Sequence, residues 1–591
     1  MDTCPRYLIT TADERTWKFD RPVIFLGEWC RIYDRKHIWE DMDAVVAAPY
    51  GLGQNQKESD HRITTEWADK LFPDLCESLN LFHGVQHDQR FWRIVLGHWF
   101  YRYVDVIFNR VKTLEKCLQT YEISGTTVFS IDSYSLAPQD TFEAIWAFND
   151  DIWNNVLNAH ILKYLSQAKF PIEIISNPLT SRSCLHENPP IRNISKRSLL
   201  WGRGQVSKLT KFLVRDNDSF ILNSSLPRWY EIKLQLALGQ FPQFWTSPKF
   251  WIADSANQAL REDLSKFIFD KSVCSRENIL NKMLFELLPV CFLEGFPSLS
   301  KQVLGLAWPK NPRFVFTSSN FDTDEVFKLW VAKKSEHGSL YFVGQHGNYG
   351  AQKNNDNPSN EELTSDKFIT WGWKDGLPQH APAFIFKTLA DKVKKYKPKG
   401  GLLLIELHSG HRLNTWDNIA EFGDYFEYQK RFVSALLPEP RKSLTIRLHS
   451  AHKRLNWNEV SRWRVFDAAL KINSSGDIRT LIAQSRLVVH SYDSTGILET
   501  LSKNIPTLAF WPNGLDNLRD SAEPFYMLLI DVGIVHLSPE SVASKINEVW
   551  NDVEGWWGRR DLQYARQQFC ERYARQSVNP IKTLLSIFNE N

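Results

Sequence analysis

The stretch LVVHSYDSTGILETLSKNIPTLAFW, residues 487–511, contains the pattern that decides the fold. An apolar run ends at His490, an amphipathic segment begins near Ser494, and a second apolar run, TLAF, follows Pro506. Short apolar runs bounded by polar turns predict buried strands, and the amphipathic segment between them predicts a helix. Strand, helix and strand in succession are typical of a parallel sheet with helices on its faces.

The same alternation extends through the C-terminal part of the chain. Ser538 and Pro539 have the residue types of a helix N-cap and a first helical turn. We therefore expect a Rossmann-like domain at 401–556 and a helical tail at 557–591 that could pack back on another domain. Strands are predicted at residues 401–407, 443–449, 486–492 and 505–511, and helices at 415–437, 476–485 and 494–504.

The first 390 residues alternate less regularly. We interpret residues 1–390 as a second α/β domain with a large helical insertion. The lysine-rich stretch at 391–400 is the best candidate for an interdomain linker. Strands are predicted here at residues 22–27, 126–132, 171–176, 313–319 and 339–345, and long aromatic-rich helices at 87–118 and 141–165.

Length and charge restrict the classes of protein to which the chain can belong. Its 591 residues exceed what one hydrophobic core usually holds, which predicts two large domains. With 71 basic and 68 acidic residues, the net charge of +3 is too balanced for a general nucleic-acid-binding protein, so no nucleic-acid partner is expected. The basic run at 391–401 is interpreted as a solvated linker, with contact to an anionic membrane surface as the alternative.

The cysteines and the N-terminal stretch indicate a reducing compartment. The eight cysteines are scattered and form no CxxC pair, which argues against a zinc or redox centre. The N-terminal stretch lacks the apolar region of a signal peptide, and no run approaches the roughly 20 apolar residues that span a bilayer. We expect a cytoplasmic protein, and peripheral contact with the inner face of the membrane stays open.

Polar residues gather where three of the predicted strands end. Three apolar runs end in a His-Ser pair, and arginines lie close to two of these pairs. In open parallel sheets, ligands bind beyond the carboxyl ends of the strands. We therefore predict a ligand-binding rim that contains His408, Arg412, Arg447, His449, His490 and Ser491.

Ser494, Thr495 and Gly496 begin the predicted helix that contains Glu499. Backbone amides and two hydroxyl groups would converge there at the positive end of a helix, which is a sensible phosphate site. The alternative is that Asp493 or Ser494 is simply the N-cap of the helix. Both interpretations stay open, because the same residue types serve both purposes.

The stretch GQHGNYG also follows a predicted strand. Its glycines Gly344 and Gly347 allow close backbone approach and left-handed turns beside Gln345 and His346. We predict that His346 is the general base that deprotonates an acceptor hydroxyl. Glu28, which follows another predicted strand in LGEWC, is the alternative base.

Asp322-Thr323-Asp324 matches the short DxD metal-binding pattern of some sugar transferases. Asp324 and Glu325 also make a good helix start, and we favour this interpretation, so no required metal is predicted. The chain has no GxxxxGK[ST] loop, no GxGxxG after a strand, no GxSxG elbow and no HExxH motif. Kinase, dehydrogenase, hydrolase and zincin activities therefore lose their usual support.

The order of these features resembles the GT-B architecture of glycosyltransferases, in which two Rossmann-like domains face a cleft and a terminal helix crosses back. Within that class, a histidine at a strand end and a later Ser-Ser/Thr pair resemble the donor-site motifs of bacterial sialyltransferases and Kdo transferases. In those enzymes the two motifs hold the phosphate of CMP. His449 matches the first motif, and Ser494 with Thr495 matches the second, whereas Ser450 stands where the family usually has proline.

Longer stretches carry a further resemblance. LGEWC, GQHGNYG and DSTGILETLSKNIPTLAFW look like the corresponding parts of a bacterial family of transferases encoded among surface-polysaccharide genes. GQHG is also similar to the His-Gly turn of the teichoic-acid glycerophosphotransferases, which use CDP-glycerol and the same architecture.

These resemblances imply an inverting, metal-independent glycosyltransferase. It would move Kdo or a sialic-acid-like keto sugar from a CMP-linked donor to a surface glycan or its lipid-linked precursor, with Glu499 at the ribose hydroxyls. The nucleotide sugar would be a substrate, so no cofactor is implied. The alternatives are a CDP-glycerol or nucleotide-diphosphate sugar transferase on the same fold, and a non-catalytic glycan-binding protein.

Overall fold

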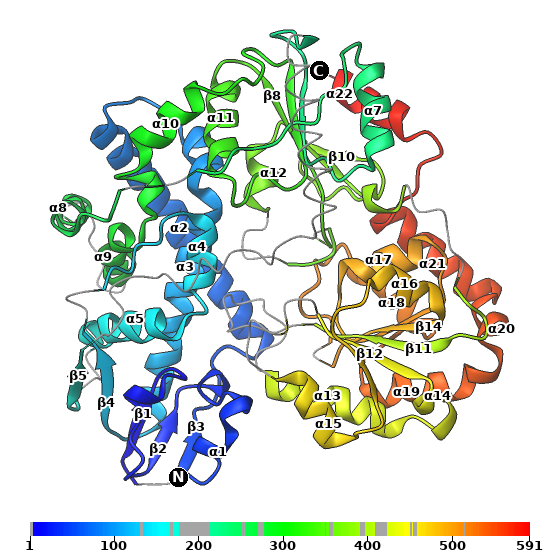
Figure 1. Cartoon of the computed structure of the whole chain (residues 1–591), viewed down its shortest axis with the longest axis horizontal. Helices are drawn as coiled ribbons and strands as arrows, with labels where there is room; N and C mark the ends of the chain where they lie inside the picture. The colour runs from blue at the N-terminus through cyan, green and yellow to red at the C-terminus, as the bar shows by residue number, and fades with distance from the viewer. Residues whose placement is uncertain are drawn as a thin grey trace, which may run out of the picture.

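Three parallel β-sheets form the framework of the described chain (Figure 1). In Figure 1 the first sheet lies at the lower left, the second at the top and the third at the lower right. The N-terminus lies beside the first sheet, and the C-terminus lies beside the second. The computed structural model describes residues 4–590 except 131–133, 166–168, 177–212, 251, 253, 270–276, 349, 354–357, 390–395, 408–421, 450, 451, 453–457 and 513.

The first sheet has the strand order β3-β2-β1-β4-β5, and all its strand pairs are parallel. The order reverses between β1 and β4, as it does where the two halves of a Rossmann fold meet. Two long helices, α2 and α3, connect β3 to β4 and form the predicted helical insertion. The elements are β1 (Arg6–Ile9), β2 (Val23–Phe25), α1 (Lys36–Trp39), β3 (Ala44–Val46), α2 (Gln54–His83), α3 (Gln89–Thr120), β4 (Ile123–Phe129), α4 (Thr141–Ala147), α5 (Asp151–Tyr164) and β5 (Ile172–Ile175).

The second sheet has the order β10-β9-β8-β7-β6 and is also fully parallel. Helix α3 of the first part packs against α11 and α12 of this part, so the helical insertion joins the two sheets. The elements are β6 (Phe220–Leu222), α7 (Arg228–Ala237), α8 (Gln258–Phe269), α9 (Glu277–Leu287), α10 (Phe296–Leu304), β7 (Phe314–Thr317), α11 (Glu325–Glu336), β8 (Leu340–Gly344), α12 (Asn360–Thr364), β9 (Lys367–Thr370), β10 (His380–Pro382) and the 3-10 turn η6 (Phe386–Thr388).

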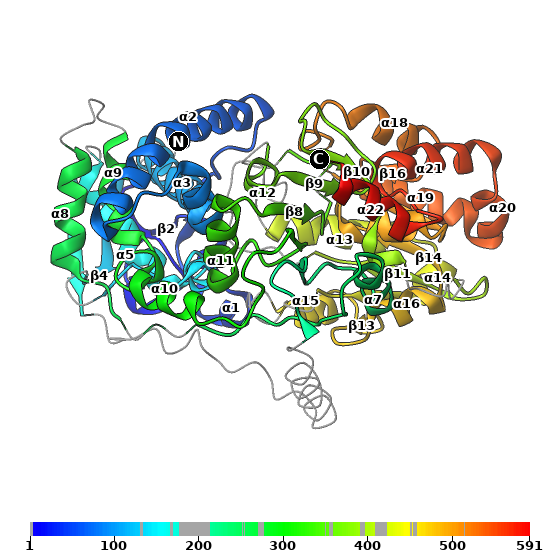
Figure 2. The same ribbon diagram turned by 90° about the horizontal axis from the view of Figure 1, so that it is seen from above.

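The third sheet has the order β13-β12-β11-β14-β15-β16, which is the full Rossmann order. Figure 2 shows this sheet and its helices at the opposite end of the molecule from α2 and α3. The elements are β11 (Gly401–Ile405), α13 (Phe422–Ala435), α14 (Pro438–Lys442), β12 (Leu444–Arg447), α15 (Glu459–Phe466), β13 (Lys471–Asn473), α16 (Ile478–Gln484), β14 (Ser485–His490), α17 (Thr495–Ser502), β15 (Thr507–Phe510), α18 (Glu523–Asp531), β16 (Val535–His536), α19 (Pro539–Val549), α20 (Val553–Trp557), α21 (Arg560–Tyr573) and α22 (Pro580–Asn589).

The strand register of the third sheet brings three strand ends together. Ile405, the last residue of β11, pairs with Arg447 at the end of β12 and with His490 at the end of β14. The strand order reverses between β11 and β14, and ligands bind outside the carboxyl ends of the strands at such a point. The described residues of the predicted rim, Arg447, His449, His490 and Ser491, therefore lie at this edge of the sheet.

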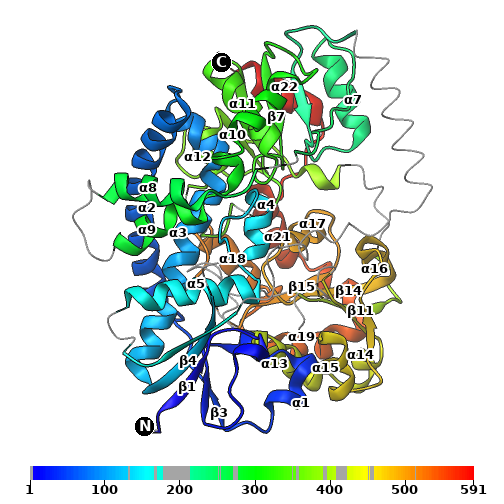
Figure 3. The same cartoon turned by 60° about the vertical axis from the view of Figure 1, so that its left-hand side comes forward.

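The last helix returns to a different sheet from the one that it follows in sequence. Helix α22 packs beside α7 on the second sheet (Figure 3). The Phe588 ring stacks on Phe314 of β7, with centroids 4.5 Å apart, and lies 5.2 Å from Phe342 of β8. The expected α/β architecture, with Rossmann-like parallel sheets and a C-terminal helix that crosses back, is therefore confirmed.

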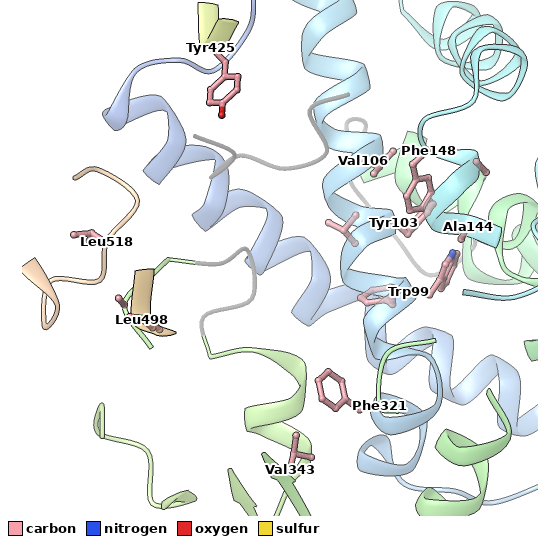
Figure 4. Close-up of a cluster of buried hydrophobic side chains, with 14 of the residues drawn as sticks. Trp99, Tyr103, Val106, Ala144, Phe148, Phe321, Val343, Tyr425, Leu498 and Leu518 are labelled. Carbon is pink, nitrogen blue, oxygen red and sulfur yellow. The ribbon is translucent and has the colours of Figure 1, made fainter. Parts of the chain in front are cut away.

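Aromatic side chains of α3 anchor the core of the N-terminal part. The rings of Trp99 and Tyr103 stack with centroids 5.2 Å apart. Figure 4 shows them beside Ala144 and Phe148, at the end of α4, and all four residues are buried. This packing fixes α3 against α4 and holds the insertion in place.

The strands predicted from sequence are all present, but several others were missed. The missed strands are only two to four residues long, which is too short for a recognisable periodicity: they are β1, β3, β6, β9, β10, β13 and β16. They complete two sheets before residue 390, where the sequence analysis expects one. The helix predicted at 141–165 is divided into α4 and α5, because the side chain of Asp150 accepts a hydrogen bond from the Trp153 amide and caps a new helix.

Within the described ranges, no helix is both long enough and apolar enough to cross a membrane.

Candidate functional site

A cavity of about 900 Å³ lies at the carboxyl edge of the third sheet, and we call it the rim pocket. Its walls come from the ends of β11, β12 and β14 and from helices α16 and α17. Six residues predicted to bind a ligand line it: Arg447, His449, His490, Ser494, Gly496 and Glu499. Residues that the sequence analysis did not select also line it, among them Glu406, Asp477, Arg479, Tyr492 and Lys503.

The first turn of α17 faces the rim pocket without a side-chain cap. Ser494 stands at the N-cap position, but its side chain makes no capping hydrogen bond. Its hydroxyl oxygen lies 3.5 Å from Nδ1 of His490 instead. The first amides of a helix have no partner within the helix and carry partial positive charge. The capping role considered for Ser494 is not observed, and phosphate binding at this turn stays a prediction.

His490 supports this turn from within the protein. Its ring is fully buried, and Nε2 lies 3.4 Å from the hydroxyl oxygen of Thr500. Burial lowers the pKa of His490 to about 3, so the ring is neutral at physiological pH. A Cβ atom on Gly496 would lie only 2.8 Å from Cε1 of this ring, which explains the glycine at that position. His490 therefore shapes the pocket through the α17 turn.

Two further predicted residues, Ser491 and Thr495, are not among the described residues that line the pocket. The hydroxyl of Ser491 donates to the carbonyl of Ile405 over 3.0 Å and lies 2.6 Å from the Tyr425 hydroxyl, so Ser491 ties β14 to β11. Thr495 is the first residue of α17. The predictions for His408 and Arg412 lie outside the described residues.

Arg447 and His449 come to the pocket from the end of β12. The Arg447 guanidinium donates to the backbone carbonyls of Leu448 and Asn473, which hold it in place. The backbone carbonyl of His449 accepts hydrogen bonds from the amide and the ring of His452, over 3.1 and 2.9 Å. These hydrogen bonds fix the Arg447 side chain and the backbone at His449 where the two residues line the pocket.

The loop after β8 is hydrogen-bonded directly to the loop before α17. The side-chain amide of Asn348 donates to Asp493 over 2.8 Å, and that of Gln352 donates to Asp493 over 3.0 Å. The hydroxyl of Tyr526 donates to the same carboxylate over 3.1 Å. Burial raises the pKa of Asp493 to about 6, although these three donors oppose the shift. The two motifs selected from sequence, GQHGNYG and DSTG, are thus brought together.

His346 lies in this loop, immediately beyond the end of β8. Its ring centroid is 5.4 Å from that of Phe321. Burial, reinforced by the positive charge of Lys387, lowers the pKa of His346 to about 4. The ring is therefore neutral at physiological pH and able to accept a proton, as a general base must be.

The other residues of the GQHG turn have structural roles. The side-chain carbonyl of buried Gln345 accepts hydrogen bonds from the Trp371 amide and the Trp373 indole, both over 2.8 Å. A Cβ atom on Gly344 would lie 2.4 Å from the Ser318 hydroxyl. The expectation of left-handed turns is wrong, because neither Gly344 nor Gly347 has a positive φ. The packing of β8 against its neighbours is what requires glycine at 344.

Glu28 lies in a 3-10 turn after β2, at the edge of the first sheet. Its carboxylate forms a bidentate ion pair with Arg31. Neither Glu28 nor His346 is among the described residues that line the rim pocket. The loop that contains His346 is, however, hydrogen-bonded through Asn348 to Asp493, which lies next to the lining residue Ser494.

The two aspartates of the DxD stretch have structural partners. Asp324 accepts a hydrogen bond from the Phe327 amide over 3.0 Å and caps α11, which confirms the predicted helix start. Asp322 forms a bidentate ion pair with Arg102 of α3 at 2.5 and 3.0 Å. Among the described residues, no group of three or more His, Cys, Asp or Glu side chains is placed to hold a metal ion.

Glu406 and Lys387 were missed by the sequence analysis. Glu406 follows β11 in LLLIEL and lines the rim pocket, and one of its carboxyl oxygens has no hydrogen-bond partner within the described structure. Burial and the negative charge of Glu459 raise the pKa of Glu406 well above its usual range. Its position after a strand was the available signal. Lys387 stands in η6, far from any predicted motif, and its proximity to Glu499 could not be read from sequence.

Solved structures share only weak likeness with the chain. The spinosyn rhamnosyltransferase SpnG aligns with 63% of this chain and 100% of its own at 10% identity and a TM-score of 0.31. WaaG, a glycosyltransferase involved in lipopolysaccharide biosynthesis, aligns with 71% of this chain and 87% of its own at 12% identity and a TM-score of 0.21. TM-scores this low do not establish a common fold, so the fold assignment rests on the observed strand orders.

Sequence comparison is more decisive. No curated protein sequence matches this chain significantly. The model of a protein family described as the LIC12162 family of transferases, however, matches residues 6–588. This match spans the three sheets, the rim pocket and nearly all of the returning helix α22. The chain therefore belongs to the LIC12162 family of transferases.

Proposed function

We propose that this transferase is a glycosyltransferase that binds a nucleotide sugar in the rim pocket and passes the sugar to a glycan acceptor. The observation that carries the proposal is the convergence, at one Rossmann edge, of the uncapped α17 turn with the loop that contains His346. A pocket of about 900 Å³ lies in the size range of small-molecule sites. Membership of a transferase family supports the reaction class.

The lining of the pocket suits a ligand with phosphate and hydroxyl groups. Positive side chains can pair with phosphate oxygens, and carboxylates can accept hydrogen bonds from hydroxyl groups. In this proposal, Ser494 and the first amides of α17 hold the phosphate, and Glu499 holds the ribose hydroxyls. The basic lining residues are Arg447, Arg479 and Lys503, and the acidic ones are Glu406, Asp477 and Glu499.

We further propose that the donor is CMP linked to Kdo or to a sialic-acid-like keto sugar. The motif resemblance of His449, Ser494 and Thr495 supports this choice, and all three stand at or beside the rim pocket. His346 takes the proton of the acceptor hydroxyl, and the new glycosidic bond forms with inversion as CMP leaves. Fixed hydrogen-bond donors stabilise the departing phosphate, so the reaction needs no metal in this proposal.

The acceptor in this proposal is a surface glycan or its lipid-linked precursor. In this proposal the acceptor lies at the cytoplasmic face of the inner membrane, where the protein makes peripheral contact. The lysine-rich linker supplies positive charge for an anionic surface.

Calorimetric and thermal-shift titrations with CMP, CDP, UDP and GDP, without metal and then with Mg²⁺, test the proposal. Binding of a ligand to the folded state raises the melting temperature. Metal-free preference for CMP is the expected result. Preference for CDP would favour glycerophosphate transfer or a diphosphate donor, and no binding of any nucleotide would overturn the proposal in favour of a non-catalytic glycan-binding protein.

A further inference from the structure

Lys387 lies outside the third sheet, beside helix α17, which lines the rim pocket. It stands in η6, in the segment that leads from the second sheet to the third, and η6 packs against α17. The preceding residue, Phe386, is buried against the end of β8, where a Cβ atom on Gly344 would lie 2.6 Å from its ring. Lys387 is therefore held between the loop that contains His346 and the helix that borders the pocket.

The ammonium group of Lys387 interacts electrostatically with three neighbouring side chains. It lies within electrostatic range of Glu499 and Arg479, which line the rim pocket, and of His346 in the loop after β8. Within the described parts of the chain, no hydrogen bond or ion pair holds this ammonium group. Burial lowers the pKa of Lys387, although Glu499 opposes the shift. A half-buried cation without a close partner is a favourable place for an anionic group of a ligand.

The position of Glu499 relates this cation to the predicted phosphate site. Glu499 lies about one helical turn, about 6 Å along the axis, beyond the first residue of α17. The phosphate is proposed to bind at that first turn, and Lys387 is held between α17 and the loop that contains His346, the proposed base. An anionic group that extends from the phosphate towards His346 would thus pass beside Lys387.

We propose that Lys387 binds a second anionic group of the donor, in addition to the phosphate held at α17. This inference rests on the proposed function, because it assumes a nucleotide in the rim pocket. The second group is either the carboxylate of a keto acid sugar or the second phosphate of a diphosphate donor. Both are oxyanions that an ammonium group can pair with.

Calorimetry on the full chain tests this inference with Lys387→Met, which keeps the length of the side chain and removes its charge. The ligands are CMP, CDP and CMP-N-acetylneuraminate, and the matched control is Lys374→Met, because Lys374 is exposed. We expect Lys387→Met to keep the affinity for CMP within about twofold and to weaken one of the other two ligands by about 10- to 100-fold, the usual range for a hydrogen bond to a charged group. Lys387→Arg, which retains the charge, should keep most of the affinity for the ligand that Lys387→Met weakens.

Each outcome decides a different point. Selective loss of CMP-N-acetylneuraminate identifies the carboxylate, and selective loss of CDP identifies the second phosphate. If the parent protein binds these ligands but Lys387→Met weakens all three equally, or weakens none, this inference is overturned and the proposed function stands. If the parent protein binds none of them, the proposed function itself fails, and the inference fails with it.

Discussion

Asn348 donates a 2.8 Å hydrogen bond from its side chain to Asp493, and this bond links the loop after β8 to the loop before α17. The two residues belong to different sheets, so the bond fixes the proposed base relative to the rim pocket. Gln352 and Tyr526 donate to the same carboxylate, which makes Asp493 the centre of the link. The position of His346 therefore depends on a carboxylate that does not need to touch the substrate.

Replacing Asp493 by asparagine should loosen this link. An amide presents one NH₂ group where only acceptors are needed, so a donor would face a donor among Asn348, Gln352 and Tyr526. We expect a loss of about 1–3 kcal/mol in unfolding free energy, and a larger loss in transfer rate than in nucleotide affinity. Denaturant unfolding and steady-state kinetics measure these effects. Asp520→Asn is the control, because that side chain is 97% exposed; equal effects of the two variants would contradict the assignment.

Asp493 also predicts a pH dependence of stability. Its pKa is raised from 3.8 to about 6 in the folded protein, so the native state binds more protons than the unfolded state between these values. The contribution of Asp493 to stability is therefore full at about pH 4 and is lost as the pH rises through 6. The difference in unfolding free energy between the parent protein and Asp493→Asn should shrink from pH 4 to pH 7. A constant difference would show that Asp493 does not titrate in this range.

Gly496→Ala should distort the first turn of α17. The added Cβ would lie 2.8 Å from the buried ring of His490, so the ring or the turn would have to shift. We expect a loss of about 1–3 kcal/mol in stability and weaker nucleotide binding, as overpacking in a filled core usually causes. Gly305→Ala is the matched control, because a Cβ there would have its nearest neighbour at 3.6 Å. Both variants would be compared by thermal unfolding and by nucleotide titration.

His346→Ala should lower the transfer rate with little effect on nucleotide binding. Removal of a general base typically slows a reaction by about 100- to 10,000-fold. Because the pKa of His346 is about 4, its neutral form predominates above pH 5, and the rate should not fall through protonation of this ring until the pH is lower. His337→Ala, at an exposed position, is the control. A rate for His346→Ala equal to that of the control would remove His346 from the reaction.

Phe588→Ala should destabilise the second sheet. The ring is 4% exposed and contacts Phe314 and Phe342, so its removal leaves a cavity that costs about 3–5 kcal/mol. Val578→Ala, at a fully exposed position just before α22, should change stability by less than about 0.5 kcal/mol. The unfolding free energies of the two variants would be measured by denaturant unfolding. Equal values would show that the packing of α22 does not stabilise the protein.

Sequence patterns predicted the fold best where strands are buried on both faces. The runs at β11 and β14 are continuous and apolar because helices cover both sides of the sheet, and they were identified with nearly correct ends. Strands such as β10, with His380 at its start, and β13, with Lys471, were missed because they are short and polar. Their pairing partners, which are distant in sequence, determine that they are strands.

The candidate site was predicted in outline only. The strand ends could be located, and six of the selected residues line one pocket. Sequence could not show that the ring of His490 is buried beneath α17, since a histidine at a strand end can point to either face. The partners of Asp493 were equally hidden, because Asn348 and Gln352 reach it from another sheet. Long-range contacts of this kind leave no local pattern.

The return of α22 has a consequence for how the chain is made. The ribosome completes the second sheet before it begins the third, but Leu584, Ile587 and Phe588 cover the apolar cluster of that second sheet. A nascent chain that has finished β10 must therefore keep this surface uncovered while the whole third sheet is synthesised. The core of the second sheet can therefore be completed only after the strands of the third sheet have been synthesised.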